Sequence, residues 1–348
     1  MKRCPKVVNI NPVSQLGIWA VLMMTSAIPA IAVSAETANR DALIALGAFL
    51  FQDRELSQDG KTSCRSCHDP VHAYADPHPR SVGASDKVGT RNAPSLVGLN
   101  DAQVFFWDGR RTHLEDAVLD PFTNPFELGL SSQEAVLKRL SKSAIGKFRN
   151  IFGSQQAPTI EQVSASLAAF VRSLGRASLF SSPASAMAND GRRLFALVGC
   201  AECHVVNESG IPDSDGQYHH SGIGEATRSP QLQQLAQDVL RENLDASALG
   251  PRVLANPQWS ELGRFVVSHH PADIGAFRTP SLRNVGVTAP YMHDGSIPTL
   301  AEAVDHEIYY HSTRRGRPVN LSQTERLAIV AFLETLTDSP EESRTAVR

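Results

Sequence analysis

The chain has 348 residues, of which 42% are hydrophobic, 20% charged and 6% aromatic, and its formal net charge is −3. This length suggests two domains of about 150 residues each. The 33 basic residues are balanced by 36 acidic residues and form no basic run, which argues against nucleic acid as a partner.

Residues 1–35 have the pattern of a cleaved export signal. A positively charged start is followed by an apolar run at residues 16–32 and by small residues at 33–35, which form a cleavage site. The run is shorter than the about 20 residues that cross a membrane, so an uncleaved anchor is the weaker alternative. The leader carries three basic residues and no acidic one, so the mature chain has a net charge of about −6.

Two copies of a Cys-x-x-Cys-His motif dominate the mature chain, at residues 64–68 and 200–204. This motif attaches c-type haem: the two thiols bond to the porphyrin, and the adjacent histidine ligates the iron. A single Cys-x-x-Cys could instead form a disulfide or half of a zinc site, but the histidine present in both copies favours haem. The motifs therefore predict two covalent haem c groups, held by Cys64, Cys67, His68, Cys200, Cys203 and His204.

The haem motifs lie within a longer internal repeat. A Leu-Phe pair on a predicted helix precedes each motif, at residues 50–51 and 194–195. The segment at 91–118 matches the segment at 278–304, and in this register Trp107 matches His293. The repeat predicts two similar halves.

Each half closes with a helix that begins at a capping box, in which side chains satisfy unpaired backbone amides. The two boxes are Thr159-Ile160-Glu161-Gln162 and Ser322-Gln323-Thr324-Glu325. A linker rich in serine and proline joins the halves near residues 175–190. We therefore predict a mainly α fold of two tandem cytochrome c-like helical domains, residues 36–180 and 181–348, each around one covalent c-type haem.

The second half contains a longer excursion between its haem motif and Arg278. Its residues 231–249 are predicted to be helical, and its residues 209–227 are predicted to form a loop. No run of alternating β-branched residues predicts a substantial sheet.

The order of these motifs resembles that of the bacterial dihaem cytochrome c peroxidase family, which includes the MauG group. The resemblance covers roughly residues 42–336. It implies that hydrogen peroxide reacts at the first haem, whose proximal ligand is His68. It also implies that the second haem, whose proximal ligand is His204, accepts and relays electrons.

The resemblance assigns catalytic roles to three further residues. Trp107 matches a tryptophan between the two haems, although an aromatic side chain packed at a domain interface is the alternative. Glu127 matches the distal acid–base glutamate. Pro121 matches a proline on the same face, whose peptide nitrogen offers iron no lone pair and so helps to keep that face open.

Two positions depart from the classical peroxidases. Ala117 replaces a glutamine, and the nearby His113 is either a substitute for it or, as we favour, a surface histidine. Ala84 stands where a histidine caps the resting peroxidatic haem, sixteen positions after the first motif. The loss of that histidine predicts a first haem that is open at rest, as in the MauG group.

The distal ligand of the second haem also departs from the family, which has methionine or tyrosine fourteen residues after the position of His293. Glu307 occupies this position. We predict Tyr309 or Tyr310 as the ligand, with Glu307 and His311 as alternatives. Replacing a thioether by an oxygen ligand should lower the reduction potential, because anionic oxygen favours ferric iron.

The resemblance further implies a calcium ion between the haems, bound by Asn92, Thr288 and Pro290. Oxygen donors suit Ca²⁺. The alternative is that Asn92 only caps a turn before Pro94.

The predicted function is that of a periplasmic peroxidase that takes electrons from a small redox protein, either a cytochrome c or a cupredoxin. A MauG-like enzyme that uses peroxide to oxidise side chains of a partner protein is the alternative within enzymes. A dihaem electron carrier without peroxide chemistry is the alternative of another class. A homodimer is left open as the assembly.

Overall fold

The computed structural model describes residues 30–153, 155–174, 185–205, 213–314, 316 and 318–338, without the side chains of residues 30–38, 101 and 314. Most of the predicted export signal and the predicted domain boundary at residue 180 lie outside the described residues. The described residues from Asn39 onward form one compact unit, and those up to Ala38 belong to another. In the described part of the chain, no helix combines the length and the apolar character needed to cross a membrane.

The first half of the chain is built from helices around one hydrophobic core. Leu50 and Phe51, the predicted pair, are both buried in it, and the Phe51 ring lies 5.1 Å from that of Phe170. These helices are α1 (Ala30–Gln52), α2 (Cys64–Cys67), α3 (Leu114–Ala117), α4 (Asp120–Thr123), α5 (Gln133–Arg139), α6 (Lys142–Phe152) and α7 (Ile160–Ser173).

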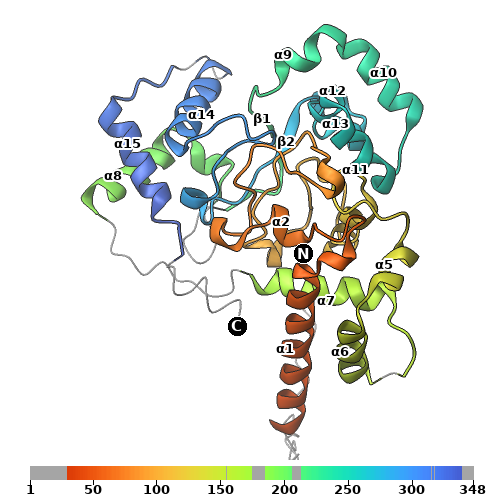
Figure 1. Ribbon diagram of the computed structural model, residues 1–348. Coiled ribbons are helices and arrows are strands. Elements are labelled where there is room, and N and C mark those ends of the chain that lie inside the picture. The colour runs from red at the N-terminus through yellow and green to blue at the C-terminus, as the bar shows by residue number, and fades with distance from the viewer. Residues whose placement is uncertain are drawn as a thin grey trace, which may run out of the picture. The chain divides into compact units, whose positions relative to one another are not determined.

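The second half contains two further cores. One lies between α8 (Ala186–Leu197), α14 (Leu300–Arg314) and α15 (Gln323–Glu334), which Figure 1 shows on one side of the compact unit. The other core is formed by the excursion after the second haem motif. Its helices are α9 (Glu225–Arg228), α10 (Leu232–Glu242), α11 (Ala246–Ala255), α12 (Pro257–Ser260) and α13 (Phe265–Ser268).

Short 3₁₀ helices connect these elements. They are η1 (Arg54–Leu56), η2 (Pro70–His72), η3 (Ala84–Asp86), η4 (Leu99–Asp101), η5 (Cys200–Glu202), η6 (Ser229–Gln231), η7 (Pro271–Asp273) and η8 (Val285–Val287).

The excursion corrects two details of the prediction. The expected helix at 231–249 is two helices, because Asn243 ends α10 in the left-handed conformation and Asp245 caps the first amides of α11. The expected loop at 209–227 contains a strand, β1 (Tyr218–His220), and the short helix α9. Strand β1 pairs antiparallel with β2 (Ala276–Arg278), and this is the sheet of the described residues.

The internal repeat is visible in how the helices pack. A Cβ at Gly47 of α1 would lie 2.0 Å from the Ser166 carbonyl oxygen of α7. A Cβ at Gly191 of α8 would lie 1.8 Å from the Ala328 carbonyl oxygen of α15. In each half, glycine therefore lets the helix before the haem motif cross the closing helix in backbone contact. Both closing helices begin with the predicted capping boxes.

The turns that carry Trp107 and His293 also have matching backbones. The residue before each has a positive φ, 67° at Phe106 and 73° at Met292. An antiparallel bridge closes each turn, from Phe105 to Arg111 and from Tyr291 to Ile297. The structure therefore confirms the register in which Trp107 corresponds to His293.

Candidate active site and haem sites

Both motif histidines present one nitrogen for iron. His68 Nδ1 lies 2.9 Å from the Tyr74 carbonyl oxygen, and His204 Nδ1 lies 3.2 Å from that of Asp213. A carbonyl oxygen only accepts hydrogen bonds, so each Nδ1 donates and Nε2 is left to ligate a metal. Burial lowers the pKa of both histidines, which favours the neutral imidazole that binds iron.

The motif cysteines are available for thioether attachment. All four are free of disulfides. Burial raises the pKa of Cys64 and of Cys67 to about 12.

A large cavity adjoins the second motif. It has a volume of about 490 Å³, within the range of about 300–1,000 Å³ that is usual for cofactor pockets. Cys200, Cys203 and His204 line it, together with apolar side chains of α8 and α15 and one face of α14. The attachment thiols, the iron ligand and the apolar walls fit a haem.

The face of α14 that lines this cavity carries Glu307 and His311, whose Oε2 and Nε2 atoms lie 3.0 Å apart. The two tyrosines preferred from the sequence lie elsewhere. Tyr309 is 71% exposed, and the Tyr310 ring stacks on that of His306 and lies against Gly222. The helical spacing of four residues brings Glu307 and His311 together, so the geometry favours them as distal ligands.

Glu127 lies near the first haem-attachment motif. Its Oε2 is buried without a hydrogen-bond partner. Burial raises the pKa of its carboxyl to about 7, and the nearby Arg110 guanidinium opposes this shift. The charge of Glu127 also acts on the thiols of Cys64 and Cys67, which places the carboxylate close to the attachment motif. A buried carboxyl that titrates near neutrality suits proton transfer.

Pro121 lies in α4, and its carbonyl oxygen accepts a hydrogen bond from Leu128 N at 3.0 Å. Ala117, in place of the family's glutamine, is buried in the first core. His113 is exposed, in agreement with the favoured interpretation of it as a surface histidine.

The loop at residues 81–88 is fixed with an alanine where classical peroxidases have their capping histidine. Ala84 is 1% exposed, and its amide donates to the Glu127 carbonyl oxygen at 2.7 Å. The Ser85 amide donates to Asp59 Oδ2 at 2.9 Å. This bond and others from the backbone near Asp59 lower the pKa of that carboxyl. The loop is therefore held in place by two independent contacts.

The two histidines near this loop in sequence are engaged elsewhere. His72 Nδ1 lies 2.9 Å from Asp69 Oδ2, and His78 Nδ1 lies 3.0 Å from Asp76 Oδ1. The His78 side chain is 73% exposed. Each imidazole is therefore in contact with a neighbouring acidic side chain.

Asp59→Asn should loosen the loop at residues 81–88. An amide nitrogen in place of Oδ2 cannot accept the hydrogen bond of the Ser85 amide, so the amides of Ala84 and Ser85 should exchange hydrogen faster. Hydrogen–deuterium exchange tests this, with Asp86→Asn as the control because Asp86 is an exposed carboxylate of the same loop. Equal exchange in the two variants would show that Asp59 does not hold the loop.

Trp107 lies at the edge of the second cavity. Its ring lines that cavity together with His204, and its Nε1 donates to the Asn92 carbonyl oxygen at 3.0 Å. Its ring centre is 6.5 Å from that of His293, in an edge-to-face arrangement. An oxidisable side chain therefore contacts the pocket of one haem while belonging to the half of the chain that holds the other.

The three residues predicted to bind calcium all line this same cavity. Asn92 Nδ2 donates to the carbonyl oxygens of Asp76 and His78, at 3.3 and 2.9 Å, so its Oδ1 is directed to the other side. These partners lie well outside the turn before Pro94, which argues against a purely local capping role. Asn92, Thr288 and Pro290 supply oxygen atoms of the kind that Ca²⁺ prefers.

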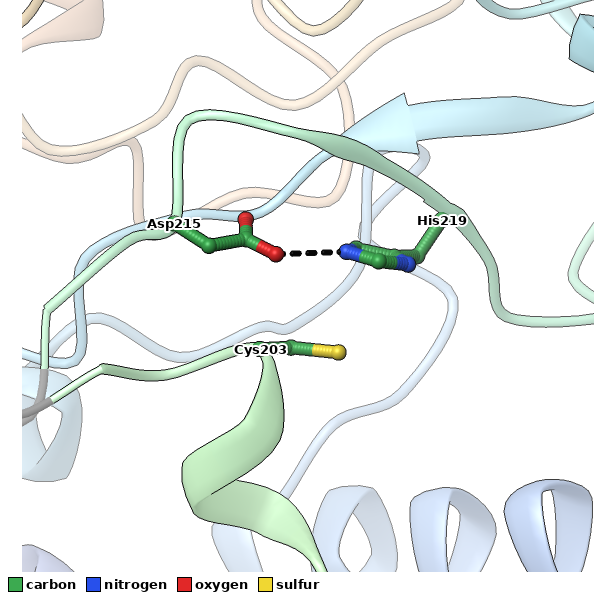
Figure 2. Close-up of side chains that lie close together, drawn as sticks. All are labelled: Cys203, Asp215 and His219. Carbon is green, nitrogen blue, oxygen red and sulfur yellow. Dashed lines mark hydrogen bonds and ion pairs between the residues drawn. The ribbon is translucent and has the colours of Figure 1, made fainter. Parts of the chain in front are cut away.

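Cys203, Asp215 and His219 form a cluster beside the second haem motif, with ligand-type atoms within 4.8 Å of one another. Figure 2 shows the Asp215 carboxylate and the His219 ring turned toward each other near the Cys203 sulfur. Asp215 Oδ2 and His219 Nε2 are 2.7 Å apart. Because haem attachment uses the Cys203 sulfur, this cluster belongs to the haem pocket and is not a separate metal site.

Sequence reasoning missed the buried charges around Trp107. Asp108, fully buried, lies 2.6 Å from Arg91 and 3.1 Å from Arg110. Asp108 and Arg110 follow Trp107 in the sequence Phe-Trp-Asp-Gly-Arg at residues 106–110, so their closeness to the tryptophan was the available signal. Glu261, which pairs with His293 at 2.8 Å, lies in the excursion and has no motif around it.

The chain is similar to known proteins along most of its length. The family model described as di-haem cytochrome c peroxidase matches residues 41–190. The chain is 33% identical over 314 residues to the methylamine utilization protein MauG of Methylorubrum extorquens, covering 85% of this chain and 78% of MauG. It is 31% identical over 326 residues to the cytochrome-c peroxidase IdrP2 of Denitromonas iodatirespirans, covering 88% and 84%.

The fold matches solved structures as well. A MauG-like protein associated with microbial copper homeostasis aligns with a TM-score of 0.67 and 25% identity, over 86% of this chain and 90% of that protein. The diheme peroxidase BthA of Burkholderia thailandensis aligns with a TM-score of 0.63 and 22% identity, over 85% and 86%.

Two haem-attachment motifs on a repeated helical fold define a dihaem c-type cytochrome. The relatives narrow this class of protein further. The chain belongs to the di-haem cytochrome c peroxidase and MauG family and is a peroxidase-type oxidoreductase with two haem c groups. The electron-carrier alternative is set aside.

Proposed function

We propose that the protein reduces hydrogen peroxide at the first haem site, with Glu127 as the acid–base residue. The observation that carries this proposal is the buried, unpartnered Oε2 of Glu127 beside the first attachment motif. When bound, haem supplies the iron at which peroxide binds and the electrons that cleave its O–O bond. Glu127 takes the proton from one peroxide oxygen and returns it to the other.

The surroundings of Glu127 keep the site ready for peroxide. The small side chain of Ala84 and the ring of Pro121 offer no ligand to iron, and the fixed loop holds Ala84 in position. Arg110 counters part of the burial that raises the pKa of Glu127, so the carboxylate form is present near neutral pH. The site therefore needs no displaced ligand before it reacts.

Electrons reach this site, in our proposal, from a small redox protein by way of the second haem pocket and Trp107. A cytochrome c or a cupredoxin is the donor. The periplasm is the compartment in which the covalent haems, the predicted cleaved export signal at residues 1–35 and such a donor occur together. Calcium bound by Asn92, Thr288 and Pro290 stiffens the segment between Trp107 and the second cavity.

A MauG-like function, in which peroxide oxidises side chains of a partner protein, is the second candidate. Glu307 lines the second cavity at the position where classical peroxidases have methionine, and His311 lines it four residues later. Oxygen or nitrogen ligands stabilise ferric iron more than a thioether does, which favours strongly oxidising chemistry over simple electron relay. The relative that is 33% identical is itself named MauG.

The fully oxidised protein should react with hydrogen peroxide without prior reduction, because Ala84 leaves the first site uncapped. Stopped-flow mixing with peroxide should change the Soret band at once. Prior reduction by one electron serves as the comparison and should not be required for this change. A spectrum that stays constant until one haem is reduced would show that another residue caps the first iron.

A further inference from the structure

Glu261 and His293 form a buried hydrogen-bonded pair that the peroxide reaction described above does not use. Glu261 Oε2 lies 2.8 Å from His293 Nε2, and the residues are 6% and 2% exposed. A Cβ at Gly224 would lie 1.5 Å from the same Oε2 atom, so the carboxylate fits only because position 224 is glycine. The fold thus makes specific room for a carboxylate in its interior.

The pair stands beside Trp107. The His293 ring stacks on Phe277, with ring centres 3.6 Å apart, and meets the Trp107 ring edge-to-face. The backbone of Asn92 holds His293 and Trp107 together. Its N–H donates to the His293 carbonyl oxygen at 2.9 Å, and its carbonyl oxygen accepts a hydrogen bond from Trp107 Nε1. Glu261 is therefore hydrogen-bonded to the imidazole whose ring meets the indole edge-to-face.

The surroundings of Trp107 are otherwise rich in positive charge. Four guanidinium groups make hydrogen bonds to residues 106–109; they belong to Arg91, Arg110, Arg264 and Arg278. Asp108, the carboxylate of this turn, is already paired with two of them. A further positive charge on the indole would be unfavourable here, because buried charges are poorly screened.

Electron relay through Trp107 creates such a charge. The indole gives one electron to the peroxide-oxidised first haem site and regains one from the second haem site. Its Nε1 proton stays in place, because its partner is a carbonyl oxygen, which is too weak a base to take it. The indole therefore passes through a positively charged state, and a nearby negative charge would stabilise that state.

We propose that the Glu261 carboxylate, held by His293, stabilises the oxidised indole of Trp107 and is a positioning residue for electron transfer between the haems. This inference rests on the proposed relay role of Trp107. Glu261 comes from α12 and its following turn, in the excursion that only the second half possesses. The excursion thus forms a hydrophobic core of its own and also supplies the negative charge of Glu261 near Trp107.

The test is Glu261→Gln in the full chain with both haems attached. Glutamine keeps the shape and a hydrogen-bonding group but removes the charge. Transfer between the haem sites, followed by stopped-flow absorption after peroxide addition, should slow by about tenfold or more, which corresponds to about 1.4 kcal/mol. The electron paramagnetic resonance signal of oxidised Trp107 should weaken, while the initial reaction with peroxide keeps its wild-type rate.

Three variants separate charge from packing. Glu134→Gln, at an exposed glutamate of α5, should match the wild type. Glu261→Asp retains the charge and should restore most of the transfer rate. His293→Gln leaves the Glu261 charge in place and should also retain most of it, which keeps the inference testable if Glu261→Gln does not fold.

Wild-type transfer and wild-type Trp107 signal in Glu261→Gln would overturn the inference, as would equal losses in Glu261→Gln and Glu261→Asp. If His293→Gln slows transfer between the haem sites as much as Trp107→Phe does, the inference is also contradicted, because the imidazole and not the Glu261 charge then supports the transfer. Failure of the proposed function looks different: the wild-type protein would not react with peroxide, or Trp107→Phe would transfer electrons normally.

Discussion

Glu127→Gln should slow the reaction of the oxidised protein with hydrogen peroxide by about 10²–10⁴-fold, the usual contribution of a positioned acid–base group. Glutamine has nearly the same shape but cannot take up and return a proton. Its amide also lacks the charge that acts on Cys64 and Cys67, yet the iron ligands His68 and His204 are untouched. The haem spectra should therefore stay close to those of the wild type while the peroxide reaction slows.

The same residue should determine the pH dependence of the peroxide reaction. Burial raises the pKa of Glu127 to about 7, so its carboxyl is mostly protonated below that pH and mostly ionised above it. Only the ionised form can take the first peroxide proton. The rate constant should rise with pH through about 7 and then level off, and this step should disappear in Glu127→Gln.

Glu115→Gln is the matched control for this experiment. Glu115 lies in the same half of the chain and pairs at the surface with Arg172, at 2.5 Å, so its loss should leave the peroxide rate unchanged. Mass spectrometry should show about 1.2 kDa of covalently attached haem in each variant, two groups of about 0.6 kDa, which excludes haem loss as the cause. A Glu127→Gln variant as fast as Glu115→Gln would remove Glu127 from the mechanism.

The parts of this fold that the sequence predicts are those governed by local chemistry. The attachment motifs follow from the covalent requirements of haem, and the capping boxes follow from unpaired amides at helix starts. The correspondence of Trp107 and His293 also came from the sequence repeat alone. The positive φ values and closing bridges that recur at both turns confirm it. The close helix crossings at Gly47 and Gly191 belong to the same repeat, but their role shows only in three dimensions.

The parts that the sequence does not predict depend on which side of an element faces a cavity. Tyr309 was attractive as an iron ligand by chemistry, yet it lies on the exposed side of α14, whereas Glu307 and His311 face the pocket. The break at Asn243 depends on one residue in the left-handed conformation within an otherwise helical pattern. Glu261 reaches His293 across 32 residues of chain, a contact that no short motif encodes.

Trp107→Phe should separate the peroxide reaction from electron transfer between the haems. Phenylalanine is far harder to oxidise than indole and has no N–H to donate to the Asn92 carbonyl oxygen. The first reaction with peroxide depends on Glu127 and should keep its rate. Transfer to the second haem site should slow strongly, and the resonance signal assigned to oxidised tryptophan should vanish.

Trp259→Phe is the control for this change, because Trp259 is the other tryptophan of the chain after residue 35. It is 1% exposed in the core of the excursion, with the Arg252 guanidinium 4.6 Å from its ring centre. Its replacement should lower stability through the cavity it leaves, while transfer between the haems continues. If Trp107→Phe and Trp259→Phe transfer electrons equally fast, Trp107 is a packed aromatic residue and electrons pass between the haems by another route. If only Trp107→Phe is slow, the indole is the relay, since the two variants make the same chemical change at a partly buried and a fully buried tryptophan.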